Sequence, residues 1–140
     1  EYCDAKGIKY IETTITNSGE LLQAAQSLAE KADAIFTPTD NTVASAMPVL
    51  AVEAQKAGIP VYTGADSLVA DGGFATVGID YTVLGRQVAA MIKKVVDGEK
   101  ISNIPVETLS EYTTIINSTT AEKIGIRLSE EQLNEFQIVE

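Results

Sequence analysis

Short runs of β-branched residues alternate with amphipathic segments along this sequence, and that alternation constrains the fold more than any other feature. Residues 33–37, 59–63 and 74–79 are short and apolar, as buried strands are. Helices are predicted over residues 21–29, 42–57 and 82–97. We therefore expect an α/β protein with a parallel sheet and helices on both faces.

The first residues predict the end of a helix followed by an extended segment. Ala5, Lys6 and Gly7 suit a helix C-terminus, because Gly favours the position after the cap. That extended segment covers residues 8–15. Only about five residues remain for the helix, fewer than the ~10–14 of an average one. We expect its beginning, and a strand ahead of it, to lie outside this chain.

Capping, breaking and apolar residues refine the predicted helices. Asn17, followed three residues later by Glu20, is the predicted N-cap of the helix over residues 21–29. Pro48 lies beyond the first turn of the helix over residues 42–57 and is expected to kink it. The helix over residues 82–97 is marked by an apolar stripe of Leu84, Val88, Met91, Ile92 and Val95.

The pattern changes in residues 101–140, where a strand over residues 109–116 and short helices near residues 119–124 and 129–136 are predicted. This stretch holds seven acidic and two basic residues. We expect it to be a strand and an acidic C-terminal wrap on the surface of one lobe formed by residues 1–140, without a second core. The letters Asn117-Ser118-Thr119 match a glycosylation sequon, but helix capping explains them better.

Composition excludes several classes of function. The chain has no His and one Cys, so it cannot build a His–Cys zinc site, a Ser-His-Asp triad or a Cys-His dyad. We expect no metal and no cofactor. The net charge of −10 argues against nucleic acid as a partner. No glycine-rich phosphate motif is present, and no run approaches the ~20 apolar residues that span a bilayer.

Polar residues follow the predicted strands at the edge where parallel α/β sheets bind ligands. Asp40, Asp66 and Asp80 each come shortly after a strand, and Thr39 and Asn41 flank the first of them. Each Asp also suits the N-cap of the next helix, and one side chain can serve both purposes. Ionised carboxylates accept hydrogen bonds only, so this edge favours an ammonium group or hydroxyls over a phosphate.

Two classes of protein fit these residues. A binding module needs only a shaped crevice, whereas an enzyme without His would use Asp as its acid or base, aided by Lys or a metal. No Lys stands at the end of a predicted strand. Binding is therefore favoured over catalysis.

Several segments resemble the tryptophan/tyrosine-type substrate-binding proteins of ABC transporters. The resemblance covers nearly the whole chain and rests on DAIFTPTDNTVASA at residues 33–46, GIPVY at 58–62, ATVGIDYTVLGRQ at 75–87, PVE at 105–107 and TIINSTTA at 114–121. It implies one lobe of the type I periplasmic-binding fold, in which two lobes hold a ligand between them. The first lobe and the first strand of the second lobe are then expected to be missing.

The resemblance also implies a function and its partners. The protein would capture a small solute, such as an amino acid, in the cleft between the lobes and deliver it to an ABC permease outside the cytoplasm, from the periplasm or a lipid anchor. Thr39, Asp40 and Asn41 would face the ligand, Asp80 would lie near the hinge, and Asp66 is the weakest assignment. The alternative is an effector-binding domain of a transcription regulator. The open sheet edge leaves a homodimer as a further hypothesis.

Overall fold

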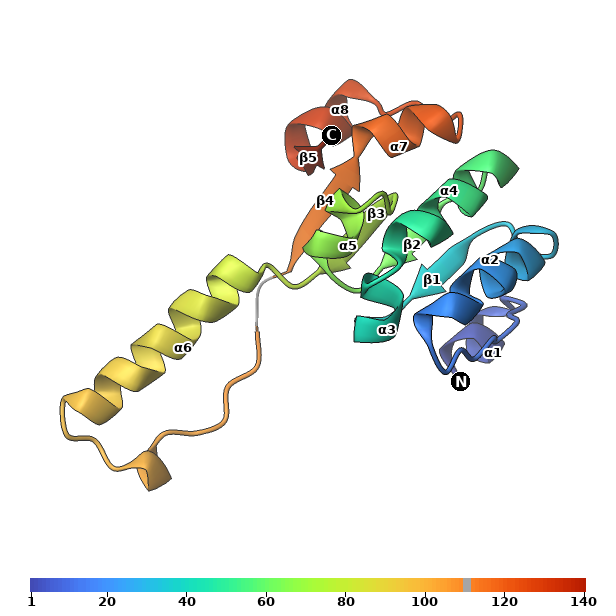
Figure 1. Cartoon of the computed structure of the whole chain (residues 1–140). Helices are drawn as coiled ribbons and strands as arrows, with labels where there is room; N and C mark the ends of the chain where they lie inside the picture. Colours follow the sequence, from blue (N-terminus) through green and yellow to red (C-terminus); the bar gives the residue numbers. More distant parts are fainter. Residues whose placement is uncertain (110–111) are drawn as a thin grey trace.

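A five-stranded sheet forms the centre of the computed structural model, which describes residues 1–109 and 112–140. The strands lie side by side in chain order (Figure 1): β1 (Ile35–Thr37), β2 (Val61–Thr63), β3 (Ala75–Gly78), β4 (Thr113–Asn117) and β5 (Gln137–Val139). The first three are parallel, β4 is antiparallel to β3, and β5 is parallel to β4. The predicted α/β class is confirmed, with one antiparallel pair in a mostly parallel sheet.

Helices connect and follow these strands. They are α1 (Tyr2–Lys6), η1 (Ser18–Glu20), α2 (Leu21–Ala29), α3 (Asn41–Ala44), α4 (Met47–Ala57), α5 (Asp66–Ala70), α6 (Tyr81–Val96), η2 (Ile101–Asn103), α7 (Ser118–Lys123) and α8 (Glu130–Glu135). Within the described residues, none of them combines the length and the apolar character that a crossing of a lipid bilayer requires.

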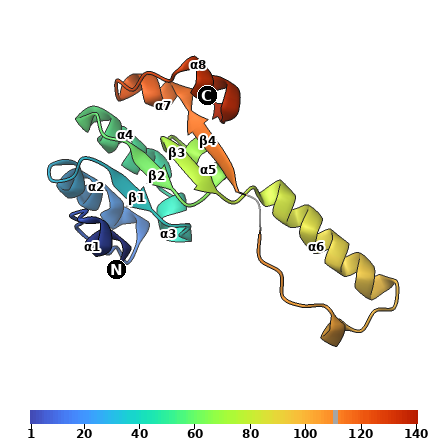
Figure 2. The same cartoon turned by 180° about the vertical axis from the view of Figure 1, so that it is seen from behind.

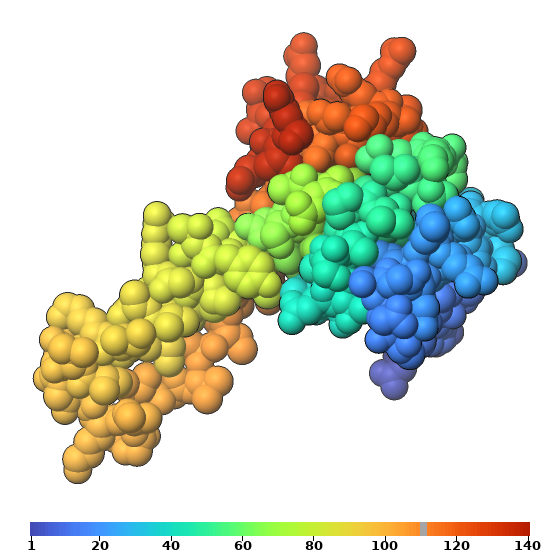
Figure 3. All heavy atoms as spheres, viewed as in Figure 1, coloured from blue at the N-terminus to red at the C-terminus, as the bar shows by residue number. Residues whose placement is uncertain are grey.

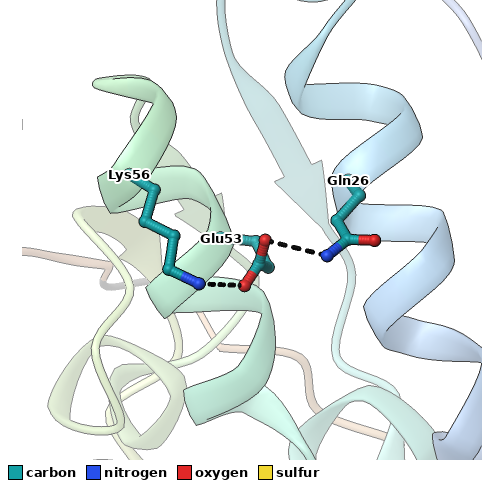
Figure 4. Close-up of polar contacts among 3 residues, drawn as sticks. All are labelled: Gln26, Glu53 and Lys56. Carbon is teal, nitrogen blue, oxygen red and sulfur yellow. Dashed lines mark hydrogen bonds and ion pairs between the residues drawn. The ribbon is translucent and has the colours of Figure 1, made fainter.

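The main core lies between α2, α4 and α5 and one face of β1 and β2. Ile35 and Val61 are partners in register and point to the same side, where they meet Met47, which is completely buried. At the rim, Gln26 Nε2 of α2 donates to Glu53 Oε2 of α4 at 3.2 Å, and Lys56 Nζ lies 2.7 Å from Glu53 Oε1 (Figure 4). The Lys56 contact, followed by that from Gln26, lowers the pKa of Glu53 below its usual value.

A second core corrects the expectation that residues 101–140 form only a surface wrap. Phe74, Ala75, Ile116 and Ala121 are buried together on the opposite face of the sheet. The tail supplies most of the side chains packed against them, namely Ile124, Ile126, Leu128, Phe136 and Ile138. Helices therefore lie on both faces of the sheet, as predicted, but the second face is covered only around Ala75 and Ile116, since Phe36 is 69% and Val77 72% exposed. The acidic residues in the described part of the tail are exposed, outside this core.

Two predicted elements differ from the structure. Residues 8–15, predicted to be an extended segment, form no helix and join no strand of the sheet, and Ile8, Tyr10 and Ile11 are each more than half exposed. The predicted kinked helix over residues 42–57 is two helices, because the chain turns at Ser45 and Ala46. Pro48 therefore lies in the first turn of α4, where its missing N–H costs no helical hydrogen bond.

The position of α6 is the largest departure from the expected layered arrangement. It leaves the end of β3 and extends away from the sheet, and the chain comes back along it toward β4 (Figures 1 and 2). No residue of α6 is buried, although its predicted apolar stripe is present. The helix is amphipathic but covers neither face of the sheet.

Candidate functional site

Three loops meet at the carboxyl edge of the parallel strands, as the sequence predicted. Gly64, after β2, lies so close to Thr39, after β1, that a Cβ atom on it would be 2.8 Å from the Thr39 backbone nitrogen. Gly78, at the end of β3, approaches the Gly64 carbonyl oxygen to 2.9 Å by the same measure. Ala65 and Ile79 form a parallel bridge just beyond. The loops that carry the candidate residues are therefore packed side by side.

Asp40 and Asp80 have the same local geometry, and each caps a helix as expected. Oδ1 of Asp40 accepts from the amides of Thr42 at 2.8 Å and Val43 at 3.0 Å. Oδ1 of Asp80 accepts from the amides at the same two positions of α6, at 2.7 and 3.1 Å. In both side chains all of these hydrogen bonds end on Oδ1, so Oδ2 can accept from a ligand.

The hydrogen bond from the Val43 amide, together with that from Thr42, lowers the pKa of Asp40 below its usual value. The carboxyl group is also exposed at the edge of the sheet. Asp40 therefore presents a negative charge to solvent at neutral pH, which is what recognition of an ammonium group requires.

Asp66 is placed differently from the other two aspartates, and its predicted role as an N-cap is wrong. It is the first residue of α5, whose N-cap is Ala65, and its Oδ1 accepts only from the adjacent Ser67 amide at 2.8 Å. It is half-buried at the same edge, because the loop after β2 lies between the other two.

Thr39 and Asn41 flank Asp40 and are both exposed. Asn41 begins α3, while Thr39 is held against Gly64 by the close approach of the two loops. A hydroxyl and an amide that face solvent can each donate and accept hydrogen bonds. The cluster Thr39–Asn41 therefore offers a ligand one negative charge and neutral donors in a single turn.

Two buried threonines beneath this edge, Thr63 and Thr76, were not predicted from the sequence. Thr76 Oγ1 donates to the Thr63 carbonyl at 2.6 Å, and Thr63 Oγ1 donates to the Ala65 carbonyl at 3.0 Å. These two bonds fix the loop after β2 from below. The sequence does contain a pattern that could have predicted them: a Thr in each of two neighbouring apolar strands. A hydroxyl buried in such a strand needs a hydrogen-bond partner.

The described residues hold no group of three or more acidic or Cys side chains that could bind a metal ion. Two hollows on the surface of the described structure lie away from the carboxyl edge. One, of about 590 Å³, is lined by α7 and the segment that follows it, including Arg127 and Leu128, and the other runs along α6. The candidate site is thus an open edge of one lobe, and not an enclosed pocket.

Comparisons with known proteins show the family and the fold of the chain. A family model described as ABC transporter substrate binding protein matches residues 1–139. A tyrosine-binding protein of Clostridioides difficile (strain R20291) is 33% identical over 127 residues, which is 91% of this chain and 37% of that protein.

Two solved structures share the fold. A conserved domain protein of Vibrio cholerae O1 biovar El Tor str. N16961 has a TM-score of 0.85 and 34% identity. The ABC domain of a Streptococcus pneumoniae protein in complex with L-Trp has a TM-score of 0.85 and 32% identity. Each alignment covers 99% of this chain and 47% of the other. The chain thus spans about half the length of these structures, and 37% of the curated relative.

Proposed function

The chain belongs to the family of ABC transporter substrate binding proteins, and on that premise we propose that it is a solute-binding lobe of an importer. The observation that carries the proposal is the convergence of Thr39, Asp40, Asn41, Asp66 and Asp80 at one edge of the sheet. A second lobe facing this edge would enclose a solute between the two. Cleft closure of this kind is a common way to hold and release a small ligand.

An amino acid is the solute that this edge suits best. The free Oδ2 of Asp40 or Asp80 would accept from the ligand ammonium, while the Thr39 hydroxyl and the Asn41 amide would donate to its carboxylate. The name of the Clostridioides difficile relative and the L-Trp complex of the Streptococcus pneumoniae protein favour an aromatic side chain. Since both relatives with a named ligand bind amino acids, they favour transport over the regulator alternative.

Membership of this family also supports a proposal about where the protein acts and what it contacts. The protein would act without chemical change to its solute, outside the cytoplasm, either free in a periplasm or held by a lipid anchor, and would hand the solute to an ABC permease. β1 is the outer strand of the sheet. A preceding strand would pair with its open edge in the two-lobe protein, and a second copy would pair there only when that strand is missing. Light scattering of the 140-residue chain shows whether such a dimer forms.

The ligand-binding role of Asp40 is separable from its capping role. A chimera in which this chain replaces the matching part of the Streptococcus pneumoniae protein provides both lobes. Asp40→Asn keeps a capping oxygen, because Asn and Asp cap equally well, but removes the charge. We expect its melting temperature to stay within about 2 °C of the parent, since no cap is lost, while its affinity for tyrosine or tryptophan falls at least tenfold in calorimetry.

Asp40→Ala is the matched control, because it removes the cap as well as the charge and is expected to lower both the affinity and the melting temperature. The proposal fails if neither amino acid raises the melting temperature of the chimera, since a ligand that binds the native state must stabilise it. If the Asp40→Asn variant binds the amino acid as tightly as the parent, the charge of Asp40 does not contribute to ligand binding and Asp40 is not a ligand-binding residue.

A further inference from the structure

The helix α5 (Asp66–Ala70) carries Asp66 at its first position and ends against the C-terminal tail. It has five residues, and a helix this short is not stable by itself in water, so contacts with its neighbours decide where it lies. Val69 follows Asp66 by three residues, which is about 4.5 Å along a helix axis. A group that holds Val69 therefore also influences where the Asp66 side chain points.

Apolar packing attaches α5 to the sheet. Leu68 is 2% exposed and belongs to the main core, and Val69 is completely buried. The hydrophobic effect has no preferred direction, so this packing keeps α5 on the sheet without fixing its rotation about the helix axis. Directional contacts are needed to fix that rotation.

Two buried side chains of the tail provide these directional contacts. Nδ2 of Asn117 donates to the Val69 carbonyl at 3.0 Å, and Oγ1 of Thr120 donates to the Gly72 carbonyl at 3.1 Å. Both donors are 4% exposed. The tail, in orange and red, lies against α4 and α5, in green (Figure 3). It thus holds the carboxyl end of α5 through hydrogen bonds that are shielded from water.

The two donors are themselves held in place. Oδ1 of Asn117 accepts from the Thr120 amide at 2.8 Å and so caps α7, while Gln55 Nε2 of α4 donates to Thr120 Oγ1 at 3.4 Å. Capping, as predicted, accounts for the letters Asn117-Ser118-Thr119. Because both side chains make more than one hydrogen bond, they form a fixed support for α5.

The other end of α5 is fixed from the sheet. Ala65, which directly precedes Asp66, bridges to Ile79, and the Ala65 carbonyl accepts from Thr63 Oγ1 at 3.0 Å. The backbone at Asp66 is therefore placed by the loops after β2 and β3. The direction in which α5 continues from there is set by the tail.

Asp66 depends on this support more than the other two aspartates do. Asp40 and Asp80 each accept from two amides of the helix that they cap. Asp66 accepts from one, the amide of the adjacent Ser67, and this bond ends on Oδ1. The direction of the Asp66 carboxylate therefore follows from the orientation of α5, and its Oδ2 can accept from a ligand.

We propose that Asn117 and Thr120 are positioning residues for ligand binding: they hold the carboxyl end of α5 and thereby aim the Asp66 carboxylate at the solute. Asp66 would accept from the ammonium group of the solute or from a hydroxyl of its side chain. The Asn117 amide donates to the Phe74 carbonyl, at the end of β3 opposite to the candidate site, so the two residues act without touching the solute. The inference rests on the proposed function, because it takes the edge that carries Asp66 as the ligand-binding face.

The test uses the chimera described above. Thr120→Val keeps the shape of the side chain and removes the hydroxyl that holds the Gly72 carbonyl. Thr119→Val is the matched control, because it is the same change at the neighbouring, exposed position of α7. In calorimetry with the amino acid that the chimera binds, we expect Thr120→Val to lower the affinity roughly threefold or more, as coupling within one hydrogen-bond network does. Thr119→Val should leave the affinity unchanged.

A double-mutant cycle with Asp66→Ala separates positioning from a general loss of stability. Asp66→Ala removes the group that the tail is proposed to aim, so Thr120→Val should no longer lower the affinity in this background. Ile138→Val trims a side chain packed on the second core and should lower the melting temperature without lowering the affinity. The inference is overturned if Thr120→Val weakens binding by the same factor with and without Asp66, or if Ile138→Val weakens it as much.

A conservative variant and a second substitution complete the test. Thr120→Ser retains the hydroxyl and should bind as tightly as the parent. If Thr120→Val does not fold, Asn117→Ser replaces it, because it removes the donor to the Val69 carbonyl and retains an oxygen for the Thr120 amide. It should show the same dependence on Asp66, and an unchanged affinity would overturn the inference.

The calorimetry also distinguishes this inference from the proposed function. A chimera that binds neither tyrosine nor tryptophan contradicts both. A chimera that binds one of them equally well with and without the Thr120 hydroxyl contradicts the positioning role alone and leaves the proposed function intact.

Discussion

Gly64 is the position where a single methyl group should disturb the candidate site most. A Cβ atom there would lie 2.7 Å from Thr39 Oγ1, 2.8 Å from the Thr39 nitrogen and 3.3 Å from the Pro38 carbonyl carbon. Ordinary contacts of a Cβ atom begin at 3.4 Å, so the two loops must separate by about 0.6 Å. The Thr39 side chain can rotate away, but the backbone nitrogen cannot.

The expected cost of Gly64→Ala follows from that overlap. The Gly64 amide donates to the Thr37 carbonyl at 3.0 Å, which resists the movement. Overpacking of this kind typically costs about 1–3 kcal/mol. For a chain of this size that corresponds to a melting temperature lowered by roughly 3–12 °C. Thermal and urea unfolding followed by circular dichroism measure both quantities.

Gly85→Ala is the same chemical change at a position with nothing within 4 Å, in the middle of α6. Alanine is favoured over glycine in an exposed helix by about 0.5–1 kcal/mol. Because α6 buries no residue in the lobe, the gain should appear as slower amide exchange in α6, with little change in the main transition. The loop packing described above is refuted if Gly64→Ala melts within about 1 °C of the parent, a shift too small for overpacking.

Two other substitutions test the tail and η1. Asn117 is 4% exposed, and its Nδ2 donates to the Val69 carbonyl at 3.0 Å while its Oδ1 accepts from the Thr120 amide at 2.8 Å. Asn117→Ala should cost about 1–3 kcal/mol in urea unfolding, because it leaves both partners without a hydrogen bond. Asn117→Ser should cost less, because Ser is uncharged and keeps a capping oxygen; equal stabilities would contradict this role. Hydrogen bonds from Thr16, first from its amide, hold the pKa of Glu20 below its usual value, so this stabilisation is present above the unfolded pKa and is lost as pH falls through the folded one. The melting temperature of Glu20→Gln should therefore lie below that of the parent at pH 7, and the difference should shrink as the pH falls through the lowered pKa of Glu20 in the folded state; a difference that does not shrink would count against it.

Features that depend on neighbours in sequence could be predicted, and the structure confirms them. Asp40 and Asp80 accept from the first turns of α3 and α6, because a cap is decided within four residues. Asn17 is also a cap, since it accepts from Gly19, but it caps η1 and not α2 as predicted, because α2 has Glu20 as its N-cap. The strands β1, β2 and β3 follow from short apolar runs. They are not fully buried as predicted, because Phe36, Tyr62 and Val77 are exposed. The edge that carries the candidate residues follows from the rule for parallel strands.

Features that depend on distant partners could not be predicted in the same way. Residues 8–15 have a strand-like pattern, but a strand forms only where another strand can pair with it, and none does in the described residues. β5 exists because Gln137 pairs with Ile115, which no local pattern announces. The apolar stripe predicted the amphipathic helix α6, but not that this helix would extend away from the sheet.

Asp80 lies where the candidate site meets the arm that residues 81–109 form beyond β3, and this couples the two. Its Oδ1 is fixed to the first turn of α6, while its backbone follows directly on β3 and on Ile79, which bridges to the loop after β2. If the arm is held by a second lobe, any rotation between the lobes must turn α6 against β3, and the Asp80 carboxylate turns with the helix. Asp40 caps a helix that belongs wholly to this lobe and would stay in place. A ligand bound to both carboxylates would therefore favour one angle between the lobes, which is the differential contact that ligand-driven closure requires.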